Sequence, residues 1–173
     1  NTNSVSVAVN VAIFGIGAGA SLASAETTAS VLATGIDGGD GENTITNTSR
    51  GLISSTSNAY ADTTSVSVNL LGYVKASAES TATAAAVGMK GGKDKDSIQN
   101  DGAVILSATS EIDASAYAVQ LMGYGESSAK GISNATVKGI VGGDGINTLI
   151  NIGSITGTAT ANGDGSSYDI QLS

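Results

Sequence analysis

Oxygen-bearing side chains recur in three glycine-rich segments of this 173-residue chain. The segments are Gly35–Ser49 (GIDGGDGENTITNTS), Gly88–Gly102 (GMKGGKDKDSIQNDG) and Gly139–Gly153 (GIVGGDGINTLINIG), at spacings of 53 and 51 residues. Because the chain has no His and no Cys, imidazole and thiolate ligands, a Ser-His-Asp triad and a cysteine nucleophile are all excluded. Oxygen ligands remain, and they suit a hard cation such as Ca²⁺.

The hexapeptides GGDGEN, GGKDKD and GGDGIN in these segments resemble the nonapeptide repeat of calcium-binding RTX β-rolls. In that family an acidic sixth residue and turn carbonyls hold calcium between stacked turns. The resemblance therefore implies a Ca²⁺ site formed by Asp40, Asn43, Asp94, Asp96, Asp144 and Asn147. Only the middle copy keeps a carboxylate at position six, Asp96, and that copy has Asp94 in place of the position-four glycine. The alternative is that the glycines supply positive φ at a tight corner, which Asn and Asp cap.

More than half of the chain consists of residues with small side chains. Ala, Ser, Gly and Thr account for 91 of the 173 residues, and proline is absent. The absence of proline suggests that almost every backbone N–H donates to a hydrogen-bonded ladder. A net charge of −8, with five Tyr and one Phe as the aromatic residues, disfavours nucleic-acid binding. No apolar run approaches the roughly 20 residues that a membrane-spanning helix needs.

Longer segments repeat at the same spacing. Ala76–Gly92 matches Ala23–Gly39 with ten identities in seventeen positions, and Ser65–Tyr73 matches Ala116–Tyr124. A fixed period of this length is typical of repeat architectures. We divide the chain into a partial first repeat (1–39), a second repeat (40–92), a third repeat (93–143) and a partial fourth repeat (144–173).

Each repeat reads as two long strands joined by a turn. In the second repeat, small residues occupy alternate positions over 55–67 and most alternate positions over 74–86, on either side of the turn at 71–73. This period of two predicts β-strands, and faces this small allow a closer approach than the usual ~10 Å between packed sheets. We therefore predict an all-β fold, a β-solenoid or β-helix of about three repeats of 51–53 residues. A stack of separate antiparallel hairpins would have the same pattern.

Stacked repeats would place similar outward residues over one another, as ladders. The apolar residues aligned at a spacing of 51 are Val66, Val68, Leu70, Tyr117, Val119 and Leu121. In the first repeat, residues 4–7 match the phase of 65–68, so that fifteen residues (8–22) replace seven (69–75) and form an apolar tip around Phe14. We expect these six residues and this tip to mediate self-association, with another copy or with neighbouring repeats of a longer chain.

A second resemblance covers nearly the whole chain. The segments 43–49, 96–102 and 147–153 follow the pattern N/D-x-I/L-x-N-x-G/S, which is similar to rungs of right-handed β-helices in secreted bacterial proteins. Together with the Ala/Ser/Thr strands, they resemble the tandem β-strand-repeat regions of large bacterial surface and adhesin-like proteins. This resemblance implies an extracellular or cell-surface location.

These observations predict a structural protein of the cell exterior that self-assembles by β-stacking into a fibre, stalk or sheath. The alternative is a repeat segment of a calcium-stabilised bacterial adhesin whose binding domain lies elsewhere. We do not expect an enzyme. Glu111 and Asp113 share a strand face as a carboxylate dyad would, but solvated charge on a polar face is the simpler interpretation.

Overall fold

The computed structural model describes residues 2–12 and 19–172, with side chains from residue 19 onward. These residues form eight strands: β1 (Thr2–Ala12), β2 (Gly19–Asp37), β3 (Thr44–Asn47), β4 (Leu52–Gly92), β5 (Ser97–Asn100), β6 (Ala103–Gly143), β7 (Thr148–Asn151) and β8 (Ser154–Gln171). The described part of the chain contains no helix of the length and apolar character needed to span a membrane.

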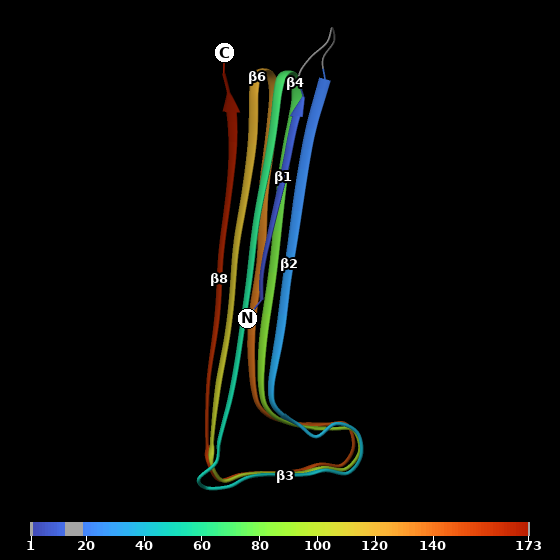
Figure 1. Ribbon diagram of the computed structural model, residues 1–173, viewed down its shortest axis with the longest axis vertical. Coiled ribbons are helices and arrows are strands. Elements are labelled where there is room, and N and C mark those ends of the chain that lie inside the picture. Colours follow the sequence, from blue (N-terminus) through green and yellow to red (C-terminus); the bar gives the residue numbers. More distant parts are fainter. Residues whose placement is uncertain (1, 13–18, 173) are drawn as a thin grey trace.

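β4 and β6 each make up most of one coil of a flat, two-limbed solenoid (Figure 1). A rising limb reaches a tip, a descending limb returns, and a short strand at a bent foot leads to the next rising limb. The tips turn at Gly72 and Gly123, whose φ angles of 117° and 139° are accessible mainly to glycine. The polypeptide thus reverses direction within a few residues while its backbone stays in extended conformation on both sides.

All strand pairs between the described residues are parallel and join successive coils. β4 pairs with β6 from Leu52 opposite Ala103 to Gly92 opposite Gly143. The remaining pairs join β1 and β2 to β4, β6 to β8, and β3 to β5 to β7. This topology confirms the predicted all-β solenoid and excludes separate antiparallel hairpins.

The inner faces of the two limbs carry the small residues. Ser55 and Ser57 on the rising limb donate hydrogen bonds from Oγ to the main-chain oxygens of Ala33 and Val31 on a descending limb, both at 2.9 Å. Because a serine side chain extends only one atom beyond Cβ, such bonds place the two backbones well within the ~10 Å that separates ordinary packed sheets. The predicted close approach of the limbs is confirmed.

Larger apolar side chains fill the wider space near the foot. The buried residues there include Ile45, Ile53, Met89, Ile98, Val104 and Leu106. The core therefore changes along the coil, from aliphatic side chains near the foot to alanine and hydroxyl side chains along the limbs.

The first coil differs from the prediction in its register. Ser4 pairs with Ala61 rather than with Ser65, while Gly19 pairs with Gly72. The tip of the first coil is therefore longer than that of the second by four residues rather than eight. Alternation alone could not decide between these registers, because any even shift keeps the same residues facing inward. The predicted apolar tip around Phe14 lies outside the described residues.

Candidate functional site: the glycine-rich corner and the apolar ladder

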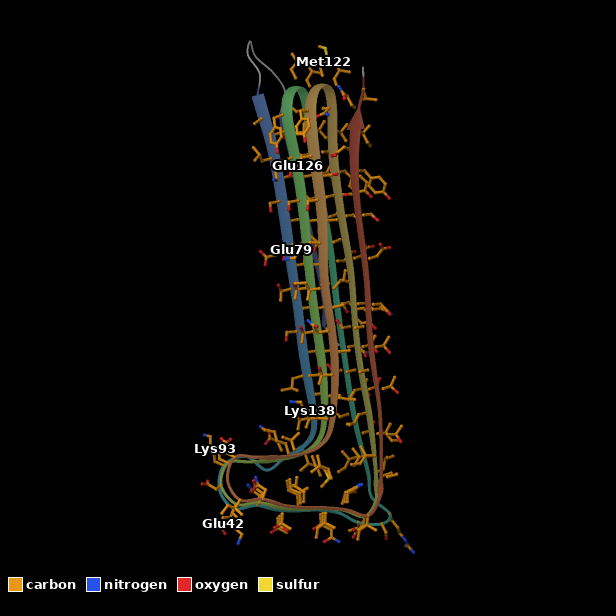
Figure 2. The ribbon with its side chains drawn as sticks, turned by 180° about the vertical axis from the view of Figure 1, so that it is seen from behind. Glu42, Glu79, Lys93, Met122, Glu126 and Lys138 are labelled. Atoms are coloured by element: carbon orange, nitrogen blue, oxygen red, sulfur yellow. The ribbon has the colours of Figure 1, made fainter. Side chains whose placement is uncertain are left out.

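The three glycine-rich segments stack at one corner of the foot, near Glu42 and Lys93 in Figure 2. Lys93 N donates to Gly39 O at 3.1 Å, and Asp144 N donates to Gly92 O at 2.9 Å. These bonds bring the six predicted metal ligands into the same corner, where they are distributed over three parallel ladders.

In the first ladder a lysine separates two aspartates. Lys93 of the second coil lies between Asp40 and Asp144, and its Nζ is 3.4 Å from Asp40 Oδ1. In a neighbouring ladder Lys90 Nζ donates to Asp37 Oδ2 at 3.0 Å, and Val141 occupies the equivalent position in the third coil. This bond, together with the one from the Gly39 amide, holds the pKa of Asp37 below its ordinary value. The second coil thus supplies a lysine to each of these two ladders. In the first ladder this lysine separates two aspartates that would otherwise repel each other.

In the second ladder an aspartate replaces glycine at a left-handed position. Gly41 and Gly145 have φ angles of 91° and 89°, and Asp94 between them has φ of 72°. Asp94 Oδ2 accepts a hydrogen bond from Gly41 N at 3.2 Å, which partly offsets the backbone strain. The carboxylate is therefore engaged by the corner itself.

The third ladder places a buried carboxylate between two asparagines. Asp96 is only 1% exposed, and its Oδ1 accepts hydrogen bonds from Asn43 N at 2.9 Å and Asn43 Nδ2 at 3.1 Å. Asp96 N in turn donates to Asn147 Oδ1 at 2.8 Å. Asp96 Oδ2 has no hydrogen-bond partner among the described residues. It occupies space above Gly91, where an added Cβ would come within 2.5 Å of it.

The asparagines in this ladder use their amide groups differently from the Asp96 carboxylate. Asn43 Nδ2 donates to Gly41 O at 2.7 Å, and Asn147 Nδ2 donates to Asp144 O at 3.1 Å. A carboxylate has no donor to offer to a turn carbonyl. Asp96 therefore leaves one buried oxygen that a bound cation would satisfy.

Acidic side chains alone do not form a metal centre here. Within the described residues there is no group of three or more His, Cys, Asp or Glu side chains that could hold a metal ion. A Ca²⁺ ion at this corner would depend on Asp96 together with amide and main-chain oxygens. Calcium binding stays a prediction.

A second asparagine ladder, whose hydrogen bonding was not predicted from the sequence, crosses the foot. Asn47 Nδ2 donates to Asn100 Oδ1, and Asn100 Nδ2 donates to Asn151 Oδ1, both at 2.7 Å. Asn47 and Asn100 are buried. The sequence signal is the asparagine that closes ENTITN, KDSIQN and INTLIN at the same position of each repeat.

The predicted apolar residues form an outward ladder on the rising limbs. Val66 pairs with Tyr117 and Val68 with Val119, as predicted. Tyr117 also stacks on Tyr168 of β8, with ring centroids 5.2 Å apart. We call the six predicted residues, Val66, Val68, Leu70, Tyr117, Val119 and Leu121, the apolar ladder. Its outermost members remain accessible, since Leu70 is 45% exposed.

A polar cluster lies beside the tip on the descending limbs. Tyr73 Oη donates to Glu126 Oε2 at 2.6 Å, and Lys75 Nζ lies 3.2 Å from Glu126 Oε1. The bond to Glu126, with desolvation and the charge of Glu126, raises the pKa of Tyr73 to about 12. The same bond and the nearby Lys75 lower the pKa of Glu126.

The candidate carboxylate dyad lies on the outer face of the rising limbs. Glu111 and Asp113 line a shallow hollow with Tyr60 and Asn162, and Glu111 Oε1 accepts a bond from Asn162 Nδ2 at 3.4 Å. Asp113 belongs to an exposed ladder with Asp62 and Asp164. No ion pair found among the described residues involves this ladder.

Comparisons with protein-family models, curated proteins and solved structures gave no match. The interpretation of this chain therefore rests on its own sequence and geometry.

Proposed function

We propose that this chain is a structural repeat module of the cell exterior, whose coils stack by β-pairing into a fibre, stalk or sheath. The observation that carries this proposal is the in-register parallel stacking of similar residues over whole coils. Every added coil gains the same ladders as the one before it, so growth along the stacking axis repeats a single interface. The added coil would come from a second copy or from further repeats of a longer polypeptide.

The outer edge of the stack supports continued pairing. In the described residues the two sheets end at β8 and β7. Ser154 N at the start of β8 and Leu172 N directly after its end both donate toward the preceding coil. Since alternate residues of a parallel strand pair with opposite neighbours, the odd-numbered residues of β8 direct their N–H groups away from β6. Such a row of free donors and acceptors is a template for another strand.

The asparagine ladder supports the same direction of growth. Each side-chain amide donates to the asparagine of the next coil. The two atoms that remain for a further asparagine are therefore Asn47 Oδ1 at one end of the ladder and Asn151 Nδ2 at the other. A further coil that carries asparagine at this position would extend the ladder by one more bond. Ladders of this kind also fix the register between stacked strands.

Blocking the outer edge of β8 tests this proposal. Changing Ala159 and Ala161 to proline removes two outward N–H groups while keeping the N–H groups that pair with β6. The matched control changes both alanines to serine, which retains the donors. We expect wild-type protein and the serine control to form rods longer than one chain in negative-stain microscopy, and the proline variant to remain as single short rods. Wild-type protein that stays monomeric in sedimentation at high concentration contradicts the proposal.

The buried Asp96 carboxylate favours a second candidate, a calcium-stabilised repeat of an adhesin. Its unpartnered Oδ2 is an available oxygen ligand in a glycine-rich corner. A ligand at about 100 times its Kd stabilises the folded state by roughly 2.7 kcal/mol, so calcium should raise the thermal midpoint by several degrees. We expect EGTA to reverse this shift and Asp96→Asn to abolish it. A midpoint that is equal with calcium and with EGTA rules out this candidate.

A further inference from the structure

The loop that follows β3 contains two residues that the equivalent loops lack. Four residues, 48–51, lie between β3 and β4, whereas two residues lie between β5 and β6 and between β7 and β8. The repeat spacing accordingly changes from 53 before this loop to 51 after it. Gly51 N donates to Thr48 O at 2.7 Å, so Ser49 and Arg50 occupy the centre of a β-turn. Thr48, Ser49 and Arg50 are all exposed.

Arg50 is the only arginine in the sequence, and it differs from most of the lysines in its surroundings. It takes part in none of the four ion pairs found among the described residues, which involve Lys75, Lys90, Lys93 and Lys130. Its guanidinium group therefore remains available to a pocket of another protein, where it can form paired hydrogen bonds with a carboxylate.

The chain on both sides of this loop is extended and paired on one side only. β3 lies at the edge of its three-stranded sheet. β4 pairs with β6 from Leu52 onward, but β1, on its other side, begins opposite Ala59. Within the described residues, segments 44–47 and 52–58 therefore each have one unpaired edge. An endopeptidase binds its substrate as an extended strand, and such an edge can pair with it.

We propose that the Arg50–Gly51 bond is a processing site for a trypsin-like serine endopeptidase. Such an enzyme holds an arginine side chain in a pocket that contains an aspartate, and its serine Oγ attacks the carbonyl carbon of Arg50. The C–N bond then breaks, Gly51 leaves with a free amino group, and water releases Arg50 as a carboxylate. Exposed loop tips with small and polar residues are preferred sites of such cleavage.

The lysines are poorer substrates, because hydrogen bonds hold their backbone in place. Four of the six lysines lie within β4 or β6, namely Lys75, Lys90, Lys130 and Lys138. Lys95 lies in the glycine-rich corner, where Lys93 N donates to Gly39 O and Ser97 N donates to Asn43 O. Both flanks of Lys95 are thus tied to the first coil. Cleavage at these lysines requires local unfolding, which lowers its rate.

A cut after Arg50 leaves the two fragments paired with each other. The first fragment contains β1, β2 and β3, and each of these strands pairs with a strand of the second fragment. Asn47 Nδ2 also donates to Asn100 Oδ1 across the same boundary. After processing, the first coil is therefore held by non-covalent pairing alone. This inference does not depend on the proposed function, because it concerns a single chain.

Limited digestion of the folded chain with trypsin tests this site. We expect mass spectrometry to show fragments 1–50 and 51–173 first, with cleavage after Arg50 at least roughly tenfold faster than after Lys95. The two fragments should elute together in size-exclusion chromatography and separate only in denaturant. Earlier or equal cleavage after any lysine would overturn the processing site, and fragments that separate without denaturant would overturn the retained pairing.

Two variants isolate the effect of the inserted residues. Arg50→Gln removes the site, and Arg50→Gln with Asp101→Arg creates the same Arg-Gly sequence in the two-residue loop between β5 and β6. We expect both variants to lack the early cut while keeping the circular dichroism spectrum of the wild-type protein. Rapid cleavage after position 101 in the folded double variant would show that an Arg-Gly sequence is sufficient without the longer loop, and it would overturn the inference.

Discussion

Asp94 shows how one residue can oppose the geometry that its neighbours require. Its left-handed φ of 72° is the conformation that glycine provides in the coils on either side. The hydrogen bond from Gly41 N to its carboxylate compensates for part of this strain. Substitutions at position 94 therefore show whether the acidic side chain contributes to the stability of the fold.

For Asp94 we predict that glycine is tolerated better than alanine. The variant Asp94→Gly relieves the strain, whereas Asp94→Ala keeps the strain and loses the hydrogen bond. We expect the glycine variant to be more stable than the alanine variant by about 1 kcal/mol. Urea denaturation followed by circular dichroism measures this difference. An alanine variant as stable as the glycine variant would contradict the assigned cause.

For Asp96 we predict that an amide improves the corner in the absence of calcium. The variant Asp96→Asn turns the unpartnered oxygen into a donor that can reach turn carbonyls, as Asn43 and Asn147 do. We expect a gain of about 1–2 kcal/mol in the free energy of unfolding in EGTA. The control Asn43→Asp places a second carboxylate next to Asp96 and should be destabilising. A loss of stability in Asp96→Asn would show that the carboxylate itself holds the corner together.

The Tyr73–Glu126 bond predicts a pH dependence with a definite sign. The folded pKa of Glu126 lies below its ordinary value of 4.5, so its contribution is present above pH 4.5 and is lost as the pH falls through the folded pKa. The variant Tyr73→Phe should raise the pKa of Glu126 toward 4.5. Carboxyl ¹³C NMR titration measures the shift, and Tyr124→Phe is the control because its hydroxyl is not part of this bond. An unchanged Glu126 titration in Tyr73→Phe would refute the role of the hydroxyl.

At the scale of an element, each limb has one face made up mostly of small side chains. Inward alanines such as Ala82 and Ala84 are completely buried, and inward serines bond to the opposite limb. Hydroxyl-to-carbonyl bonds between limbs require both backbones to be close, so they set an upper limit on side-chain volume. Thinness is therefore a requirement of the fold rather than a side effect of composition.

Two adjacent alanines give a matched test of this requirement. Ala84 is 0% exposed on the inner face, while Ala85 faces outward in register with Leu32 of the previous coil. The variant Ala84→Leu should cost about 3 kcal/mol or more, because overpacking typically costs 1–3 kcal/mol and here the limbs cannot separate locally. Ala85→Leu should leave the thermal midpoint nearly unchanged. Equal midpoints for the two variants would contradict the assigned facing.

At the scale of the whole molecule, charged and apolar side chains are both exposed at the foot, while the apolar ladder occupies one outward face of the rising limbs. The foot holds the ion pairs of Lys90 and Lys93 as well as the exposed Ile146 and Ile152, and Met122 marks the tip at the other end (Figure 2). Stacking extends the foot and the apolar ladder into continuous stripes. An extended stripe of exposed apolar residues is a site of lateral association.

We predict that lysines on the apolar ladder prevent bundling of filaments. The test variant changes Val66, Val68 and Leu70 to lysine. The control changes Ser54, Thr56 and Thr64 to lysine. These residues lie on the outward face of the same limb, so the control adds the same charge as the test variant. We expect micrographs of the test variant to show separate filaments, while the control bundles like wild-type protein. Normal bundling of the test variant would exclude the apolar ladder as a lateral contact.

Much of the fold could be predicted from the sequence, because the repeat period specifies which residues stack and the alternation along each strand specifies which residues face inward. A period of 51–53 residues aligned Val66 with Tyr117 and Tyr73 with Tyr124, and the period of two identified the inner faces. The corner was also located from its glycines. The register of β1 was predicted wrongly, because strand alternation is unchanged by an even shift.

The sequence by itself determined the repeat, the inward faces and the residues that stack, because in a parallel in-register stack each residue's neighbours are its own equivalents. Tertiary structure alone decided which hydrogen bonds form between the limbs and inside the corner. Which serine meets which carbonyl depends on how far the two facing limbs are offset, and strand alternation does not specify that offset. The unpartnered oxygen of Asp96 likewise follows from the shape of the corner, since only the folded chain encloses it.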